Sequence, residues 1–176
     1  PGPEHERRLL ELLAQAELDP HSFICFVEGT PVTLVDGTTR PIEQMKAGDE
    51  VIDQNGVTQV VEAAWCEGTP SEVTEIEVAG RMIRATHNHK WPVVRSVPGG
   101  SATRIVCKRD ILATIELTSA QIKTGDFLIS PRDQGMAELF RVGHVALVTN
   151  DKPVYNLTVS GSHTYLVYHL ATANCY

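Results

Sequence analysis

The spacing of hydrophobic positions along the chain changes near residue 24. In residues 4–18, apolar side chains recur at helical spacing, and charged residues crowd the first half. This pattern predicts an amphipathic helix that ends before Pro20, because proline disfavours helix in the preceding residue. The segment is either a helix packed on the following domain or a flanking piece of another protein.

After residue 24, short β-branched runs alternate with turn residues. Residues 31–35 are rich in strand-forming types and stop at Asp36-Gly37, which predicts a hairpin. Similar turn signals punctuate the rest of the chain, so we expect an all-β domain of many short strands. Short helical pieces are predicted near Ile42–Met45 and Ser119–Ile122, and a loop from Pro98 to Thr103.

The chain contains an internal repeat. Residues 44–52 (QMKAGDEVI) match residues 121–129 (QIKTGDFLI) at five of nine positions, with an offset of 77 residues. A second match joins residues 76–80 to residues 157–161. Two copies are too few for a solenoid, so we expect one domain with pseudo-two-fold symmetry.

Charge and hydropathy exclude several classes of partner. The formal net charge is −7 and the pI is about 5.4, which disfavours binding to nucleic acid or to an anionic membrane. No apolar run approaches the roughly 20 residues that span a bilayer, and no signal-peptide pattern is visible. We therefore expect a cytoplasmic monomer with no nucleic-acid or membrane partner.

The four cysteines are widely spaced and form no CxxC pair, which disfavours a zinc knuckle. We expect thiols rather than disulfides in a reducing compartment. For Cys66 and Cys107 we expect buried structural positions, the usual place of a free cysteine.

Cys25 and Cys175 each follow a peptide bond that a thiolate could attack or be transferred across. Exchanging an amide for a thioester is unfavourable in free energy. A site that does so must strain the amide, protonate the departing amine or stabilise the oxyanion. The run 86–89 (THNH), which follows a predicted strand at 81–85, offers groups for this: His89 as a proton donor and Thr86 as a hydrogen-bonding group.

Asn174 has chemistry of its own. Its side-chain amide can attack its own backbone carbonyl, which forms a succinimide and cuts the chain before Cys175. A nearby histidine would assist, and the candidates are His163, His169 and His144. Taken alone, an Asn-Cys pair is an ordinary loop dipeptide.

Taken together, these motifs resemble the Hint (hedgehog/intein) family from Cys25 to Cys175, and in particular a mini-intein. The similar stretches, in order, are 25–32 (CFVEGTPV), 42–51 (IEQMKAGDEV), 80–89 (GRMIRATHNH), 154–159 (VYNLTV) with 163–167 (HTYLV), and Asn174-Cys175.

The resemblance implies autocatalytic protein splicing through a single turnover, without a cofactor. Cys25 would perform an N-to-S acyl shift at the Ile24–Cys25 bond, with Thr86 and His89 assisting. Cys175 would accept the acyl group by transthioesterification. Asn174 would then cyclise with help from His163, and an S-to-N shift would join the flanks.

The resemblance also implies a fold and a domain arrangement. The fold would be the flat, pseudo-symmetric β horseshoe of Hint domains, over residues 25–174 and without a homing endonuclease. Residues 1–24, with their short helix, and residues 175–176 would be extein-like flanks, and these flanks would be the substrate.

The sequence departs from the family pattern at two positions. Ala173 stands where the family usually has histidine, so either His163 suffices for cyclisation of Asn174 or the precursor is slowed or trapped. Asn156 stands where an aspartate is common, and an amide can orient by hydrogen bonding but carries no charge. Trp91 follows the Thr/His motif, and we expect it in the core.

Zinc is expected as an inhibitor and not as a cofactor. His87 and His89 form an HxH pair that would face one side of a strand, and with Cys25, Cys175 or His163 this pair offers soft ligands. No metal site is otherwise predicted.

Three alternatives to splicing stay open at this point. One is a Hint-type module that cleaves itself without ligation. Another is a non-catalytic domain whose cysteines and histidines are structural or metal-bound. The third is a multi-turnover Cys/His hydrolase.

Overall fold

The computed structural model describes residues 3–4, 6–8, 24–95, 103–108 and 114–173. Residues 3–4 and 6–8 are helical, in agreement with the start of the predicted N-terminal helix, whose remainder lies outside these ranges. The predicted loop at 98–103 also falls almost wholly outside them. No helix within the described ranges is of the length and apolarity needed to cross a membrane.

Almost all regular structure is antiparallel β, as predicted. The strands are β1 (Phe26–Val27), β2 (Pro31–Thr33), β3 (Thr39–Pro41), β4 (Glu50–Ile52), β5 (Thr58–Gly68), β6 (Glu72–Val78), β7 (Arg81–Ala85), β8 (Lys90–Val94), β9 (Thr103–Cys107), β10 (Ile115–Thr118), β11 (Phe127–Pro131), β12 (Met136–Thr149), β13 (Val154–Val159), β14 (Thr164–Val167) and β15 (Leu170–Ala173). The two predicted helical pieces are the 3-10 turns η1 (Ile42–Gln44) and η3 (Ser119–Gln121). The hairpin predicted at Asp36-Gly37 joins β2 to β3, with Gly37 at φ 87°.

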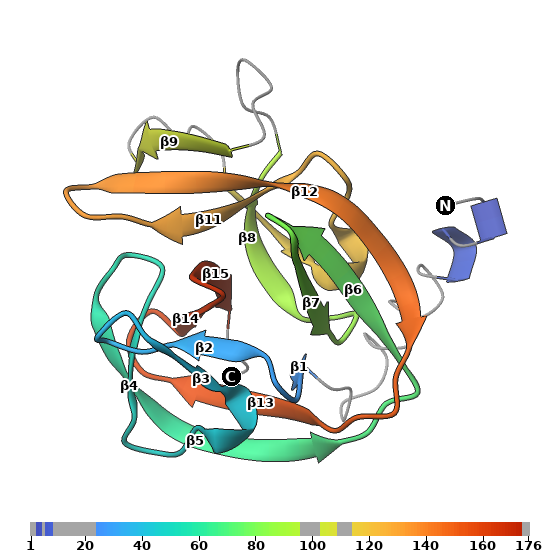
Figure 1. The fold of residues 1–176 in the computed structure, drawn as a ribbon, viewed down its shortest axis with the longest axis horizontal. Coiled ribbons are helices and arrows are strands. Elements are labelled where there is room, and N and C mark those ends of the chain that lie inside the picture. The colour runs from blue at the N-terminus through green and yellow to red at the C-terminus, as the bar shows by residue number, and fades with distance from the viewer. Residues whose placement is uncertain (1–2, 5, 9–23, 96–102, 109–113, 174–176) are drawn as a thin grey trace.

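The strands form two sheets. The large sheet has the order β10-β8-β11-β12-β6-β7-β1-β13-β5-β4, with β9 added at β12, and the small sheet has the order β15-β14-β2-β3. The two longest strands, β5 and β12, each pair with a strand of the other half of the chain: β5 with β13, and β12 with β6. Figure 1 shows these two pairs as curved ribbons that wrap around β14 and β15.

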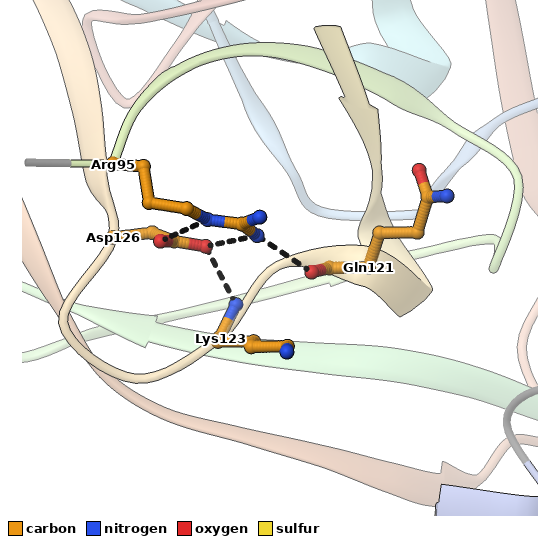
Figure 2. Close-up of polar contacts among 4 residues, drawn as sticks. All are labelled: Arg95, Gln121, Lys123 and Asp126. Atoms are coloured by element: carbon orange, nitrogen blue, oxygen red, sulfur yellow. Dashed lines mark hydrogen bonds and ion pairs between the residues drawn. The ribbon is translucent and has the colours of Figure 1, made fainter. Parts of the chain in front are cut away.

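The internal repeat is a repeat of structure. In the second copy, Asp126 accepts a hydrogen bond from the backbone N–H of Lys123 at 2.8 Å and forms an ion pair with Arg95 at 3.1 Å (Figure 2). In the first copy, Asp49 makes the same two contacts: it accepts a hydrogen bond from the backbone N–H of Lys46 and forms an ion pair with Arg40, both at 2.9 Å.

The glycines before these aspartates complete the match, because Gly48 and Gly125 have φ values of 96° and 95° that favour glycine. The predicted pseudo-two-fold symmetry therefore has a local cause, the KxGD turn that starts β4 in one half and β11 in the other.

The main core lies where the two halves meet. It contains Phe26, Trp91 and Tyr165, all fully buried, together with aliphatic residues from both halves. Trp91 thus has the core position predicted for it, and its indole N–H donates to Ser119 Oγ at 2.9 Å. Because β1 and β15 enter this core from opposite ends of the chain, the two ends of the domain are brought together.

Candidate active site

The strand β1 begins directly after Cys25 and lies between β7 and β13. Phe26 pairs with Ala85 of β7 on one side and with Tyr155 of β13 on the other. Cys25 is fully buried, in a small apolar cluster with Val27, Val73 and Val154. The sheet therefore fixes the backbone at the Ile24–Cys25 bond from both sides.

Thr86 holds the backbone of Cys25 by hydrogen bonds in both directions. The Cys25 N–H donates to Thr86 Oγ1 at 2.9 Å, and the Thr86 N–H donates to the Cys25 carbonyl at 2.9 Å. The same hydroxyl lies 3.3 Å from that carbonyl oxygen. Thr86 thus contacts the nitrogen of the peptide bond that the sequence marks as scissile.

His89 is completely buried between the two ends of the domain. Its ring packs against Phe26 with centroids 4.2 Å apart, and its Nε2 lies 2.9 Å from Thr172 Oγ1 on β15. Burial lowers the pKa of His89 to about 3, although the nearby backbone of Ala173 and of Ile24 acts in the opposite direction. The imidazole is therefore neutral at physiological pH and lies close to the backbone of Ile24 and of Ala173.

His87 contacts a different residue from His89. Its Nδ1 lies 2.7 Å from Thr74 Oγ1, and burial lowers the pKa of its imidazole. The expectation that His87 and His89 face one side of a strand is wrong, because both lie in the turn between β7 and β8 and reach different partners. Within the described ranges no three His, Cys, Asp or Glu side chains form a metal-sized cluster. Cys175, which was also named as a possible zinc ligand, lies outside the described ranges.

Asn156 lies on β13, one residue beyond the Phe26–Tyr155 pair, so the register points it toward Cys25. It is 1% exposed, and its Oδ1 is a buried acceptor with no hydrogen-bond partner among the described residues. An unsatisfied buried acceptor is costly, which makes it available to a donor from the reaction centre.

The predicted helper His163 lies in the β13–β14 turn at φ 59°, with its Nδ1 3.0 Å from the carbonyl of Val159. The next residue, Thr164, pairs with Ala173, the last described residue before Asn174. Asn174 and Cys175 themselves lie outside the described residues.

The other two candidate helpers lie elsewhere. His169 is in the turn at the far end of the β14–β15 hairpin, bonded to Thr33 Oγ1 at 3.2 Å, and His144 is exposed on β12.

The expectation that Cys66 and Cys107 are buried is wrong. Cys66 is exposed on β5 and Cys107 is half-buried on β9. Cys66 pairs with Tyr155 on one side, in the half of β5 that lies beyond the Thr58–Val60 segment paired with β4. All three cysteines within the described ranges are free thiols, as expected.

Two contacts of the site were not predicted from the sequence. His89 lies near the backbone of Ala173 at the C-terminal end as well as near that of Ile24 at the N-terminal end. Thr172, whose hydroxyl oxygen lies 2.9 Å from His89 Nε2, carries no motif in the sequence that could have singled it out.

The fold matches that of inteins. An intein-like domain from Clostridium thermocellum aligns with 88% of this chain and 100% of its own, at 25% identity and a TM-score of 0.64. A DnaB intein from Synechocystis aligns with 86% of this chain and 99% of its own, at 15% identity and a TM-score of 0.64. The gp41-1 intein aligns with 85% of this chain and 98% of its own, at 18% identity and a TM-score of 0.60.

The chain is a Hint-fold domain of the intein type. Comparison with family models and with curated protein sequences finds no match, so the relationship is visible in structure. The predicted mini-intein fold is confirmed. As this chain spans nearly the whole of these solved intein chains, the Hint domain accounts for most of its length.

Proposed function

We propose that this Hint domain is a protein-splicing precursor that processes its own flanks in a single turnover. The observation that carries the proposal is the contact of Thr86 and His89 with the Ile24–Cys25 junction, while His89 also reaches the backbone of Ala173. The flanking segments, residues 1–24 and 175–176, are the substrates. Residues 25–174 are the excised domain.

The first step is the transfer of the Ile24 acyl group from nitrogen to sulfur. The Cys25 thiolate attacks the Ile24 carbonyl carbon, the C–N bond to Cys25 breaks and a thioester forms. The thiol proton ends on the departing nitrogen. A neutral His89 suits this transfer, because it can accept the proton first and then donate it. Thr86 keeps the nitrogen in place, and Asn156 supports the thiol side.

The remaining steps join the flanks. The Cys175 thiolate attacks the thioester and releases the Cys25 thiol. The Asn174 side-chain nitrogen attacks its own carbonyl, which forms a succinimide and frees the Cys175 amine, with His163 assisting. That amine then attacks the new thioester, so an amide joins Ile24 to Cys175 and the Cys175 thiol is restored.

Ala173 makes the C-terminal step the slow one. The residue pairs with Thr164 and is 9% exposed, so the position directly before Asn174 carries a buried methyl group in place of an imidazole. Self-cleavage at the N-terminal junction without ligation is therefore the second candidate function, and it is favoured wherever Asn174 fails to cyclise.

Thiol-induced cleavage tests the first step. The full chain is incubated with a small thiol under chelation of zinc, and intact mass follows cleavage between Ile24 and Cys25. Cys25→Ala should abolish this cleavage, while Cys66→Ala, which removes an exposed thiol on β5, should leave it unchanged. Cleavage that persists in Cys25→Ala would refute the assigned nucleophile.

A further inference from the structure

Thr172 forms a bridge between the C-terminal strand and the histidine of the N-terminal junction. Its side chain is fully buried on β15, and its hydroxyl oxygen lies 2.9 Å from His89 Nε2. The same oxygen lies 3.1 Å from the carbonyl oxygen of Lys90 at the start of β8. One threonine hydroxyl therefore joins the imidazole to the backbone of the next residue.

The geometry of the bridge determines which nitrogen of His89 carries the proton. A backbone carbonyl only accepts hydrogen bonds, so the single hydroxyl proton of Thr172 is donated to Lys90. The hydroxyl oxygen then accepts from His89, which requires the proton on Nε2. The remaining nitrogen, Nδ1, then holds a lone pair. It is buried and meets no partner with hydrogen-bond geometry among the described residues, although the backbone of Ile24 and of Ala173 lies near the ring.

The rest of the pocket anchors the backbone of His89 and packs on its ring. The His89 carbonyl accepts from the backbone N–H of Ser119 at 2.8 Å, while Phe26 and Trp91 pack on the ring. A free Nδ1 lone pair is the form of histidine that can take a proton. The backbone contact to Ile24 places this ring next to the bond that the proposed acyl shift breaks.

We propose that Thr172 is a positioning residue that fixes the Nε2–H tautomer of His89 and so ties the first splicing step to the docking of β15. The inference rests on the proposed function. Thr172 lies on β15, two positions before Asn174. When β15 is not docked, His89 therefore loses the acceptor of its Nε2–H hydrogen bond. The N-terminal step then proceeds efficiently only when the C-terminal end is in place.

The tautomer can be read directly by long-range 1H–15N NMR of His89 in the full chain carrying Cys25→Ala, which cannot perform the acyl shift. We expect a protonated Nε2 and an unprotonated Nδ1 in this chain and with Thr172→Ser added. We expect loss of that single form with Thr172→Val. Two results would overturn the inference. One is an Nδ1–H tautomer of His89 in the chain that keeps Thr172. The other is a Thr172→Val chain that folds and still shows the same tautomer as the chain with Thr172.

Thiol-induced cleavage in the chain with native Cys25 provides the kinetic test. Thr172→Val should slow cleavage at Ile24–Cys25 by about tenfold or more, a part of the 10²–10⁴-fold that acid–base groups typically supply, and Thr172→Ser should restore it. Thr33→Val is the matched control, since Thr33 is also buried and bonded to a histidine, His169, at the far end of the same hairpin. It should leave the rate unchanged.

The two hypotheses fail in different ways. If the unaltered chain is not cleaved by thiol, the proposed function fails, and the NMR experiment still decides the role of Thr172. If the chain is cleaved and Thr172→Val is cleaved at the same rate, the function stands and the inference is overturned.

Discussion

The amide nitrogen of Cys25 donates a hydrogen bond to the Thr86 hydroxyl oxygen at 2.9 Å, although the two residues are 61 positions apart in the chain. The contact exists because β1 pairs with β7, and Thr86 is the first residue after β7. A side chain from the middle of the first half is thereby fixed on the nitrogen that leaves in the proposed acyl shift.

Removing the Thr86 hydroxyl should slow the first step. Thr86→Val keeps the shape of the side chain but loses the hydrogen bond to the Cys25 nitrogen. A net hydrogen bond of about 1 kcal/mol corresponds to about a fivefold change in rate, and we expect a loss of about that size in thiol-induced cleavage. Thr86→Ser keeps the hydroxyl and should be close to the unaltered chain. Equal rates for Thr86→Val and the unaltered chain would exclude a role for this contact.

Burial of His89 should make stability depend on pH. Its folded pKa of about 3 lies below the ordinary value of 6.5, so the unfolded chain binds a proton between these values while the folded chain does not. The contribution is fully present above about pH 6.5 and is lost as the pH falls toward 3, at up to about 1.4 kcal/mol per pH unit. Urea unfolding between about pH 7 and 4 measures it.

The matched pair of variants isolates His89 from the other histidines. His89→Gln should flatten the fall in stability, whereas His144→Gln, which alters an exposed histidine on β12, should keep it. His87 and His169, whose pKa values burial also lowers, add the same slope to both variants. An identical slope in His89→Gln and the unaltered chain would contradict the burial account.

Restoring the family's histidine should speed the C-terminal step. Ala173→His puts an imidazole on the backbone position that pairs with Thr164 and precedes Asn174. We expect cleavage at Asn174–Cys175 to rise by about tenfold or more, within the range of general acid–base catalysis, with release of residues 175–176 seen by mass. Ala173→Ser, which adds a polar group of small size, should give no comparable gain. No acceleration with histidine would mean that His163 and His89 already suffice.

The turn that carries His163 depends on a glycine. A Cβ at Gly161 would lie 2.3–2.5 Å from the Gln59 amide, and Gln59 Nε2 is itself bonded to Asp53 at 3.0 Å. Gly161→Ala should therefore destabilise the chain beyond the roughly 1 kcal/mol that a positive φ costs, and slow C-terminal cleavage.

Gly56→Ala is the control for that comparison, because Gly56 has a similar φ of +77° but open space around it. It should show only the backbone cost, measured by the midpoint of urea unfolding. Equal destabilisation by Gly161→Ala and Gly56→Ala would show that Gln59 moves aside freely.

Much of the fold could be predicted from the sequence because its signals are local. The repeated KxGD segments predicted the symmetry, since each needs only a glycine, an aspartate and neighbouring backbone to form its turn. The Asp36-Gly37 hairpin and both 3-10 turns followed from turn chemistry alone.

The remaining features depend on contacts that no local pattern records. The burial of Cys66 was predicted wrongly because β4 pairs only with the Thr58–Val60 end of β5, and the sequence does not specify how far that pairing extends. The strand face expected for His87 and His89 was wrong because β7 ends at Ala85. Thr172 escaped notice because its importance comes from packing of β15 on β8 across 82 residues.

Mass spectrometry of the full chain carrying Ala173→His tests the central claim, that both ends of the domain are reaction sites of one precursor. After expression and incubation with zinc chelated, we predict two products: residues 25–174 released as one species, and residues 1–24 joined to residues 175–176. A chain that stays whole, with and without added thiol, would contradict the account.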